Sequence, residues 1–570
     1  MYFDTAFGST FAWYHPPAEP ATSLGVVLCP PIGSELMCSY HPLRELAHTL
    51  ADSGVAVLRA DYQGTGDATG QDEDPDRLSA WLGTIDAAID QLRALGCEHV
   101  GLIGLRLGAT LAAVAASRRK DVAGVVLWAP LKSGNAYARE MKMLALTESN
   151  PVSAKLLPVT EGAIEAGGFL LTASTLSELA AIDLHHLPAV APRLLLISRD
   201  DMADSDKLAT MLKATHVNWP GYADMMLAPH YATPAPETFS KIAAWIGEPH
   251  ARSAKSTQPN RFEAEPSIDV AGSVREHAIR FGPDQALFGI LAEPLHATPR
   301  ATAIVLPNMG ANSHVGPNRM YVRMARRWAA LGYHVLRFDL GGVGESEPRA
   351  DQSPNAPYSW HGVRDFDLGI AEVRRRTGAT EVIAIGMCSG AYVAFHAGLL
   401  GSAMTRQILV NPQAFYWKEG DSLDAAPATV AAKVQAYNAS MRTWASWKKL
   451  LTGRARYGAL VVTLGRRVRD LCATWLKRAG SRLGLLQQTD DLGHDLRVLA
   501  DRNIDVLLIY SENDAGLVYL KDRAARDVSR LISNGQLEIE TIAHADHTFT
   551  RQEAQSRLIA VMTSHLTRSM

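Results

Sequence analysis

Cysteine is scarce in this chain of 570 residues, and the few cysteines present suit neither a disulfide framework nor a zinc site. They are odd in number and scattered, at Cys29, Cys38, Cys97, Cys388 and Cys472. The chain has no uncharged apolar run of the roughly 18 residues that a transmembrane helix needs. Its first residues carry neither a basic stretch nor an apolar core, so no signal peptide is expected. We therefore expect a cytoplasmic protein in a reducing compartment, without a metal or cofactor.

The chain also lacks a strong excess of charge of either sign. Its formal net charge is −3 at pH 7, which gives no reason to expect a nucleic-acid partner. Hydrophobic residues make up 47% and charged residues 20%, as in an ordinary globular protein. A chain of this length exceeds what one hydrophobic core usually organises, so two or more domains are expected.

The most informative segment that is present is Glu381–Ala394, EVIAIGMCSGAYVA. It predicts a buried strand, a sharp turn and a helix, with Gly386 and Gly390 two residues either side of Cys388. This is the layout of a nucleophile elbow, G-x-Nuc-x-G, with cysteine in the usual place of serine. Ser389 is the competing nucleophile, but the glycine frame centres on Cys388.

The same layout occurs earlier in the chain, in Val100–Ala112, VGLIGLRLGATLA, with Arg106 at its centre. An arginine is always protonated and cannot act as a nucleophile. Other motifs repeat in the same order. Asp61 and Asp339, each in an R-x-D-x-x-G-x-G segment, are 278 residues apart, and Arg106 and Cys388 are 282 apart. Motifs at a nearly constant offset predict two domains built on one plan.

Both halves alternate short apolar strands with helical segments. In the second half we expect strands at 302–306, 334–339, 381–385, 407–410 and 505–510, and helices at 321–331, 362–377 and 391–400. Near-continuous apolar strands between helices predict an α/β fold with mostly parallel sheets covered on both faces. We expect domains at 1–247 and 271–570, joined by a linker at 248–270 where the periodic pattern stops.

These motifs resemble the α/β-hydrolase superfamily over nearly the whole chain. The second half is similar to bacterial hydrolases with a cysteine elbow, in Pro307–Gly310, Gly316–Arg319 and Gly386–Ala391. The first half resembles hydrolase-like proteins associated with exosortase and exopolysaccharide systems, in Pro30–Gly33 and Gly104–Gly108. The resemblance implies two tandem α/β-hydrolase domains, an inactive N-terminal one and a catalytic C-terminal one.

In this superfamily the chain order is nucleophile, acid, histidine. Asp514 follows an apolar strand at its carboxyl end, where such sites lie, and Glu512 is the fallback acid. His547 precedes the last helical segment and is the expected base, with His544 as its competitor. The resemblance therefore implies a Cys388–His547–Asp514 triad that cleaves an ester or thioester through a covalent acyl-thioester.

Two further groups of residues are assigned to this site. The backbone N–H groups of Ser389 and Met309 are the expected donors of the oxyanion hole. His314 and Arg319 lie in the polar loop that follows Met309. We expect them either to contact the substrate or to hold the loop.

Residues 411–505 contain no strand that matches the first half, so we expect a helical cap at about 413–500. Residues 441–482 hold eleven Lys or Arg and one acidic residue, interleaved with Trp444, Trp447 and Trp475. This pattern is typical either of a solvated helical face or of a surface for an anionic partner. The candidates are a coenzyme A thioester, an acyl-carrier protein or a membrane surface.

In the first half, Asp201 and His230 occupy the places of an acid and a histidine, and Arg106 is expected either to pair with such a carboxylate or to hold an anionic group. Without a nucleophile this half is expected to be a structural or gating pseudo-hydrolase, or a binding module. For the whole protein an acyl hydrolase is the main hypothesis. An acyltransferase of natural-product or polysaccharide assembly and a non-catalytic scaffold are its rivals.

Overall fold

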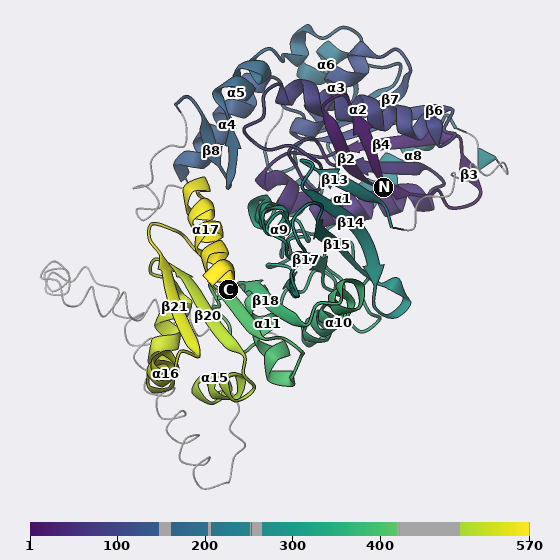
Figure 1. The fold of residues 1–570 in the computed structure, drawn as a ribbon. Coiled ribbons are helices and arrows are strands. Elements are labelled where there is room, and N and C mark those ends of the chain that lie inside the picture. The colour runs from purple at the N-terminus through teal and green to yellow at the C-terminus, as the bar shows by residue number, and fades with distance from the viewer. Residues whose placement is uncertain are drawn as a thin grey trace, which may run out of the picture.

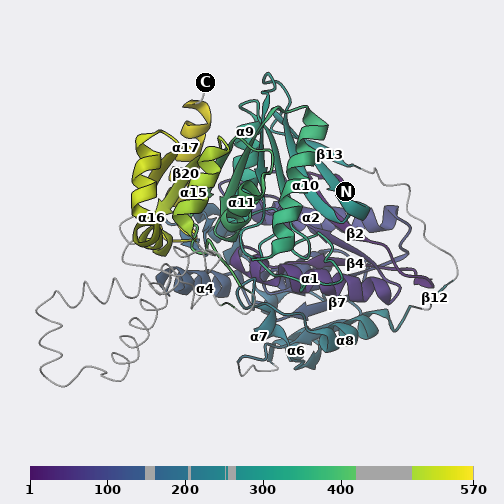
Figure 2. The ribbon, with the colours of Figure 1, turned by 90° about the horizontal axis from the view of Figure 1, so that it is seen from below.

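The structure is a computed structural model that describes residues 1–147, 161–202, 207–250, 252–253, 265–418, 421 and 491–568. It contains two large sheets, one in each half of the chain, and the halves pack against each other (Figures 1 and 2). The first half runs from purple to blue in Figure 1, and the second from teal to yellow.

The sheet of the first half has eight strands. In spatial order they are β1 (Tyr2–Thr5), β2 (Gly8–His15), β5 (Ala56–Ala60), β4 (Leu24–Cys29), β6 (His99–Leu105), β7 (Val122–Trp128), β10 (Leu194–Ile197) and β11 (Thr215–Val217). The strands from β5 to β11 are parallel, and β2 joins them antiparallel. The central strands carry apolar side chains on both faces of the sheet. Both faces must therefore be shielded from water, and helices pack on each side.

Helices cover both faces of this first sheet. On one face lie α1 (Ser34–Asp52) and α8 (Pro236–Gly247), and on the other α2 (Arg77–Ala94) and α3 (Leu107–Arg118). Smaller elements complete the half: β3 (Ala21–Thr22), α4 (Gly134–Thr147), β8 (Ile164–Ala166), β9 (Phe169–Leu171), α5 (Ala173–Ala180), α6 (Lys207–Leu212) and α7 (Tyr222–Met225).

The sheet of the second half has nine strands. They are β13 (Ser267–Val270), β14 (Val274–Phe281), β15 (Leu287–Pro294), β17 (His334–Asp339), β16 (Thr302–Leu306), β18 (Glu381–Met387), β19 (Arg406–Val410), β20 (Asp505–Ser511) and β21 (Leu537–Ile542). From β14 onward, this order repeats that of the first sheet strand for strand.

Helices again cover both faces. One face carries α9 (Met320–Ala329) and α17 (Gln552–Arg568), and the other α10 (Trp360–Thr377), α11 (Ser389–Leu400), α15 (Leu492–Asp501) and α16 (Ala515–Ser533). The predicted fold class, mostly parallel sheets flanked by helices in two α/β units, is confirmed.

Two predicted boundaries differ from the structure. Strand β13 lies inside the predicted linker, because Ile268 and Val270 turn inward as an edge strand of the second sheet while β12 (Arg252–Ser253) pairs with β3. Helix α15 lies inside the predicted cap but packs against α11 and α16 in the helix layer. The rest of the predicted cap, including the basic stretch 441–482, lies outside the described residues.

The halves meet through equivalent residues. Phe11 and Phe288 occupy the same place in their sheets, opposite Asp61 and Asp339, and their ring centroids are 6.2 Å apart. A contact between a position and its own counterpart is the mark of a two-fold, isologous interface. No helix in the described part of the chain is long and apolar enough to cross a membrane.

Ion pairs across the interface follow the same two-fold rule. Arg59 of the first half contacts Glu345 of the second at 2.8 Å, and Arg337 of the second half contacts Asp67 of the first at 2.5 Å. The arginines are equivalent under the repeat, and so are the two carboxylates. All four side chains are buried or nearly so, which makes the interface a permanent part of the fold rather than a surface contact.

Candidate active site

The elbow lies where β18 runs into α11, with Cys388 immediately before the helix. Cys388 has φ 51° and ψ −112°, a strained backbone conformation for a residue with a side chain. A Cβ atom at Gly386 would overlap the backbone of Gly390, and one at Gly390 would overlap the carbonyl oxygen of Asn308. Both glycines are therefore required by close backbone approach, as the sequence predicted.

The first half holds Arg106 in the same backbone conformation, with φ 56° and ψ −123° at the start of α3. The N–H of Arg106 donates to Trp128 at 2.9 Å, and the N–H of Cys388 donates to Val410 at the same distance. A Cβ atom at Gly108 would again overlap a loop carbonyl. The two elbows are therefore one backbone structure with two different central side chains.

Asp514 and His547 are brought together at the carboxyl edge of the second sheet. Asp514 is buried at the start of α16, and its carboxylate accepts from the N–H of Gly516 at 2.8 Å. Its other oxygen lies 2.8 Å from Nδ1 of His547. His544 and Glu512, the alternative base and acid, form a separate pair, with Nδ1 of His544 3.3 Å from the Glu512 carboxylate.

His547 and Cys388 shift each other's ionisation. Burial alone would raise the pKa of the Cys388 thiol, but the nearby charge of His547, the Tyr358 hydroxyl and the N–H of Ser389 lower it. Burial alone would lower the pKa of His547, but Cys388 and Asp514 raise it to about 10. Together these shifts favour a thiolate beside an imidazolium.

The other described cysteines have the opposite character. Burial raises the pKa of Cys29 to about 12 and those of Cys38 and Cys97 to about 11. Only the thiolate is nucleophilic, so these three thiols are inert near neutral pH. Cys472 lies outside the described residues.

Three side chains that the sequence did not indicate complete the surroundings. The amide of Gln413 lies 3.0 Å from Nδ1 of His547, and Asn411 donates to the carbonyl of His547 at 2.7 Å. Both residues follow β19, the strand that lies between the elbow strand β18 and the acid strand β20. Their position at the carboxyl end of that strand could have indicated from the sequence that they lie near the site. The Tyr358 hydroxyl lies 3.7 Å from the Cys388 sulfur.

The loop predicted to supply the oxyanion hole contacts the elbow directly. The Ser389 hydroxyl accepts from the N–H of Gly310 at 2.8 Å, and both Ser389 and Met309 are buried. The hydroxyl of Ser389 therefore fixes the loop, which argues against Ser389 as the nucleophile. The N–H of Ser389 contributes to lowering the pKa of the Cys388 thiol.

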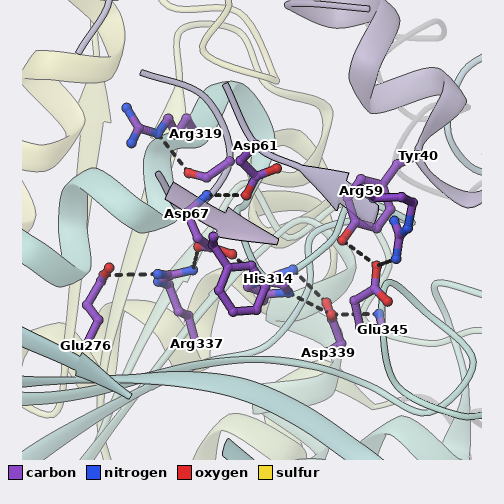
Figure 3. Close-up of polar contacts among 12 residues, drawn as sticks. Tyr40, Arg59, Asp61, Asp67, Glu276, His314, Arg319, Arg337, Asp339 and Glu345 are labelled. Carbon is purple, nitrogen blue, oxygen red and sulfur yellow. Dashed lines mark hydrogen bonds and ion pairs between the residues drawn. The ribbon is translucent and has the colours of Figure 1, made fainter. Parts of the chain in front are cut away.

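His314 and Arg319 lie in the interface between the halves, where both contact residues of the first half (Figure 3). The His314 ring contacts Asp67 of the first half and Asp339 of the second, each at 2.7 Å. Burial alone would lower the pKa of His314, but these two carboxylates raise it to about 10. The expectation that His314 contacts substrate is wrong, because both ring nitrogens are occupied and the side chain is 1% exposed.

Arg319 is buried in the same interface, and its guanidinium is fully engaged there. Its guanidinium donates to the backbone carbonyls of Gly64, Gly66, Ala68 and Gly70 in the first half. A substrate role for Arg319 is therefore wrong as well, and the alternative of a residue that holds structure fits. Its partners are some 250 positions away, so no local pattern could reveal them.

In the first half, Arg106 at the elbow forms ion pairs with two glutamates. Arg106 pairs with Glu35 at 2.7 Å and with Glu140, rather than with Asp201 as one alternative supposed. Asp201 instead accepts two hydrogen bonds from Arg199 at 2.7 and 2.8 Å. His230 packs against the ring of its neighbour Tyr231 at 4.1 Å.

Strand order, paired elbows and the late acid and histidine define an α/β-hydrolase. A family model described as "Serine aminopeptidase, S33" matches residues 36–189 and 299–554, and the chain belongs to this family. The family name specifies serine, whereas this chain carries Cys388 at the elbow of its second half. Among described residues no cluster of three or more His, Cys, Asp or Glu side chains is arranged to hold a metal.

Several solved structures are similar to parts of this chain at low sequence identity. Est1E from Butyrivibrio proteoclasticus, with bound ferulic acid, is 19% identical over 42% of this chain and 97% of its own, with a TM-score of 0.32. Proline iminopeptidase from Mycobacterium smegmatis is 16% identical over 44% and 97%, with a TM-score of 0.31. XC6422 from Xanthomonas campestris is 13% identical over 55% and 98%, with a TM-score of 0.29. No curated protein matches the chain.

Proposed function

We propose that this protein is an acyl hydrolase of ester or thioester bonds with Cys388 as nucleophile, His547 as base and Asp514 as the group that orients the base. The observation that carries the proposal is the elbow thiol facing a histidine that a buried aspartate holds at 2.8 Å. A thiolate at a strained turn, with a base and an orienting acid, is the arrangement that covalent acyl transfer requires.

The reaction would run in two halves. The Cys388 thiolate attacks the acyl carbon, and the carbonyl oxygen becomes an oxyanion facing the N–H groups of Ser389 and Met309. The C–S bond persists while the alcohol or thiol leaves with a proton from His547. Water then attacks the acyl-thioester and gives its proton to His547, which releases the carboxylic acid and restores the thiolate.

The proposal also covers the molecule that supplies the acyl group and the molecule that receives it. Acyl groups on coenzyme A or on an acyl-carrier protein are the favoured donors, with the basic stretch 441–482 as their contact and, as an alternative, a site of peripheral membrane contact. An alcohol or amine acceptor in place of water would make the protein an acyltransferase of natural-product or polysaccharide assembly.

We also propose that the two halves arose by tandem duplication, and that the first half is a pseudo-hydrolase with a structural role. The matched strand order and the self-equivalent interface support a fused two-fold dimer of single domains. Arg106 supports the loss of catalysis, because it cannot act as a nucleophile and its guanidinium is paired with Glu35 of α1 and Glu140 of α4.

The test is to incubate the full chain with p-nitrophenyl esters and acyl-coenzyme A thioesters and to look for an acyl adduct by peptide mass spectrometry. We expect the adduct on Cys388, and free acid as product. Added alcohols or amines that appear in an ester or amide product would indicate the transferase instead. The hydrolase and transferase proposals both fail if no adduct forms and Cys388→Ala keeps the turnover, and a non-catalytic scaffold is then favoured.

A matched control is Cys38→Ala. Cys38 is partly exposed like Cys388, but burial and nearby Glu35 raise the pKa of its thiol. Its removal should leave both adduct and turnover unchanged.

A further inference from the structure

One polar group next to the Cys388 sulfur has no part in the triad. Tyr358 lies in the loop between β17 and α10, two residues before the helix begins, and its side chain is buried. Its hydroxyl oxygen is 3.7 Å from the sulfur, a hydrogen-bonding distance for an atom as large as sulfur. Against a neutral thiol either atom can donate, but against a thiolate only the tyrosine can.

The Tyr358 ring is held in place by aromatic neighbours from two other segments. It stacks on Trp417 with centroids 4.3 Å apart and an interplanar angle of 13°, and it meets Tyr392 of α11 edge-on at 5.5 Å. Packing of this kind fixes both side-chain torsions. The hydroxyl is therefore presented to the sulfur by a rigid wall rather than by a freely moving loop side chain.

The first half provides an internal comparison. The residue just before the helix is Ser359 in the second half and Asp76 in the first, so Pro75 takes the place of Tyr358. At the elbow of that half the central residue is Arg106. The half with a thiol at its elbow carries the Tyr358 hydroxyl. The half with an arginine at its elbow has a proline at this position, which offers no side-chain donor.

We propose that Tyr358 is a further catalytic residue, which donates a hydrogen bond from its hydroxyl to the Cys388 thiolate and stabilises it before acyl transfer. This inference rests on the proposed function of Cys388. Burial and the charge of Cys388 raise the pKa of Tyr358, so the phenol stays protonated and available as a donor throughout the working range. Tyr358 transfers no proton, because His547 handles every proton of the cycle.

Stabilising a thiolate has two opposite effects that can be measured separately. It lowers the pH at which the thiolate forms, and it also makes the thiolate a weaker nucleophile, since nucleophilicity falls with thiol pKa. Removing the hydroxyl should therefore move the ionisation midpoint upward and raise the limiting rate at high pH. A residue that merely fills space would produce neither change.

The experiment measures the second-order rate of Cys388 alkylation by iodoacetamide against pH, by peptide mass spectrometry, without substrate. In Tyr358→Phe we expect the midpoint to rise by about half to one pH unit. The rate at the high-pH plateau should increase up to about threefold. Tyr392→Phe is the matched control, because it removes a hydroxyl from the same aromatic cluster and should shift the midpoint by less than about 0.2 unit. Thermal unfolding verifies that each variant is folded.

Equal midpoints in Tyr358→Phe and the wild type, or equal shifts in the two phenylalanine variants, would overturn the inference. Because the assay needs no substrate, its outcome is separate from that of the proposed function. If the midpoint moves but Cys388→Ala keeps full turnover, the thiolate contact stands and the catalytic assignment of both residues fails. If Cys388→Ala is inactive and the midpoint does not move, only Tyr358 loses its role. A second readout is the thiolate absorbance near 240 nm, taken as the difference from Cys388→Ala.

Discussion

The two elbows share a backbone and differ in chemistry. Cys388 and Arg106 have nearly the same strained torsions, the same backbone hydrogen bond and the same close glycine contacts. Around them the side chains diverge, because Tyr358 and Gln413 of the second half correspond to Pro75 and Leu131 of the first. Elbow geometry therefore belongs to the fold and does not by itself indicate activity. The residues facing the central side chain are what separate a candidate catalyst from a relic.

The largest expected effect comes from removing the thiol. Cys388→Ala should lower kcat/KM by about 10³-fold or more, because every later step depends on the covalent intermediate. Steady-state hydrolysis of aryl esters and thioesters measures it. In a Cys388→Ala background, Arg106→Cys should restore nothing, since the carboxylate of Asp201 is already held by Arg199. Recovered activity in that double variant would contradict the division of labour between the halves.

Much of this comparison could be predicted from the sequence, for a physical reason. Strands such as β16 and β18 are buried on both faces and therefore read as nearly continuous apolar runs, and the elbow glycines are fixed by close contacts. The acid and the histidine follow from chain order and from the carboxyl edge of the sheet. These features are local or set by a single sheet.

What could not be predicted depends on contacts between distant segments. His314 and Arg319 are polar loop residues, and a substrate role was reasonable until the first half was seen to bury them. Tyr358 lies beside the thiol, and its ring stacks on Trp417, a residue distant from it in the chain. The edge strand β13 was missed because a four-residue alternation inside a proline- and serine-rich stretch is a weak signal.

A second way to break the comparison is to remove the arginine of the first elbow. Arg106→Ala leaves the Glu35 and Glu140 carboxylates without their cation, and burial already raises the pKa of Glu35. We expect a loss of about 3 kcal/mol in the free energy of unfolding, measured by urea titration, with turnover unchanged.

The control for that variant is Arg199→Ala, whose ion pair with Asp201 is partly exposed and should cost less than about 1 kcal/mol. Arg106→Met should recover part of the loss, because its longer apolar side chain fills space that Arg106→Ala leaves empty. A loss in turnover instead of stability would indicate that the first elbow takes part in catalysis.

The interface that joins the halves should depend on pH through His314. The folded-state pKa of His314 is raised to about 10, above the ordinary value of about 6.5. Its stabilising contribution is therefore fully present below about pH 6.5 and is lost as the pH rises through 10. His314→Gln should lower the free energy of unfolding by about 2 kcal/mol at pH 7 and by less near pH 10.5. His185→Gln, at a partly exposed pair with Asp183, is the control. Equal losses at both pH values would contradict a charged His314.

The smallest expected effect comes from changing the residue three positions after β19 in the second half and after β7 in the first. This residue is Gln413 in the second half and Leu131 in the first. Gln413 touches Nδ1 of His547 at 3.0 Å, so Gln413→Leu should loosen the ring and lower kcat about three- to tenfold while KM stays constant. Leu131→Gln is the mirror change and should leave turnover untouched, because the central residue of its elbow is Arg106, which cannot act as a nucleophile. If both variants behave alike, Gln413 is only a neighbour of the site. The chemical difference between the halves then shrinks to Cys388, its two triad partners and Tyr358.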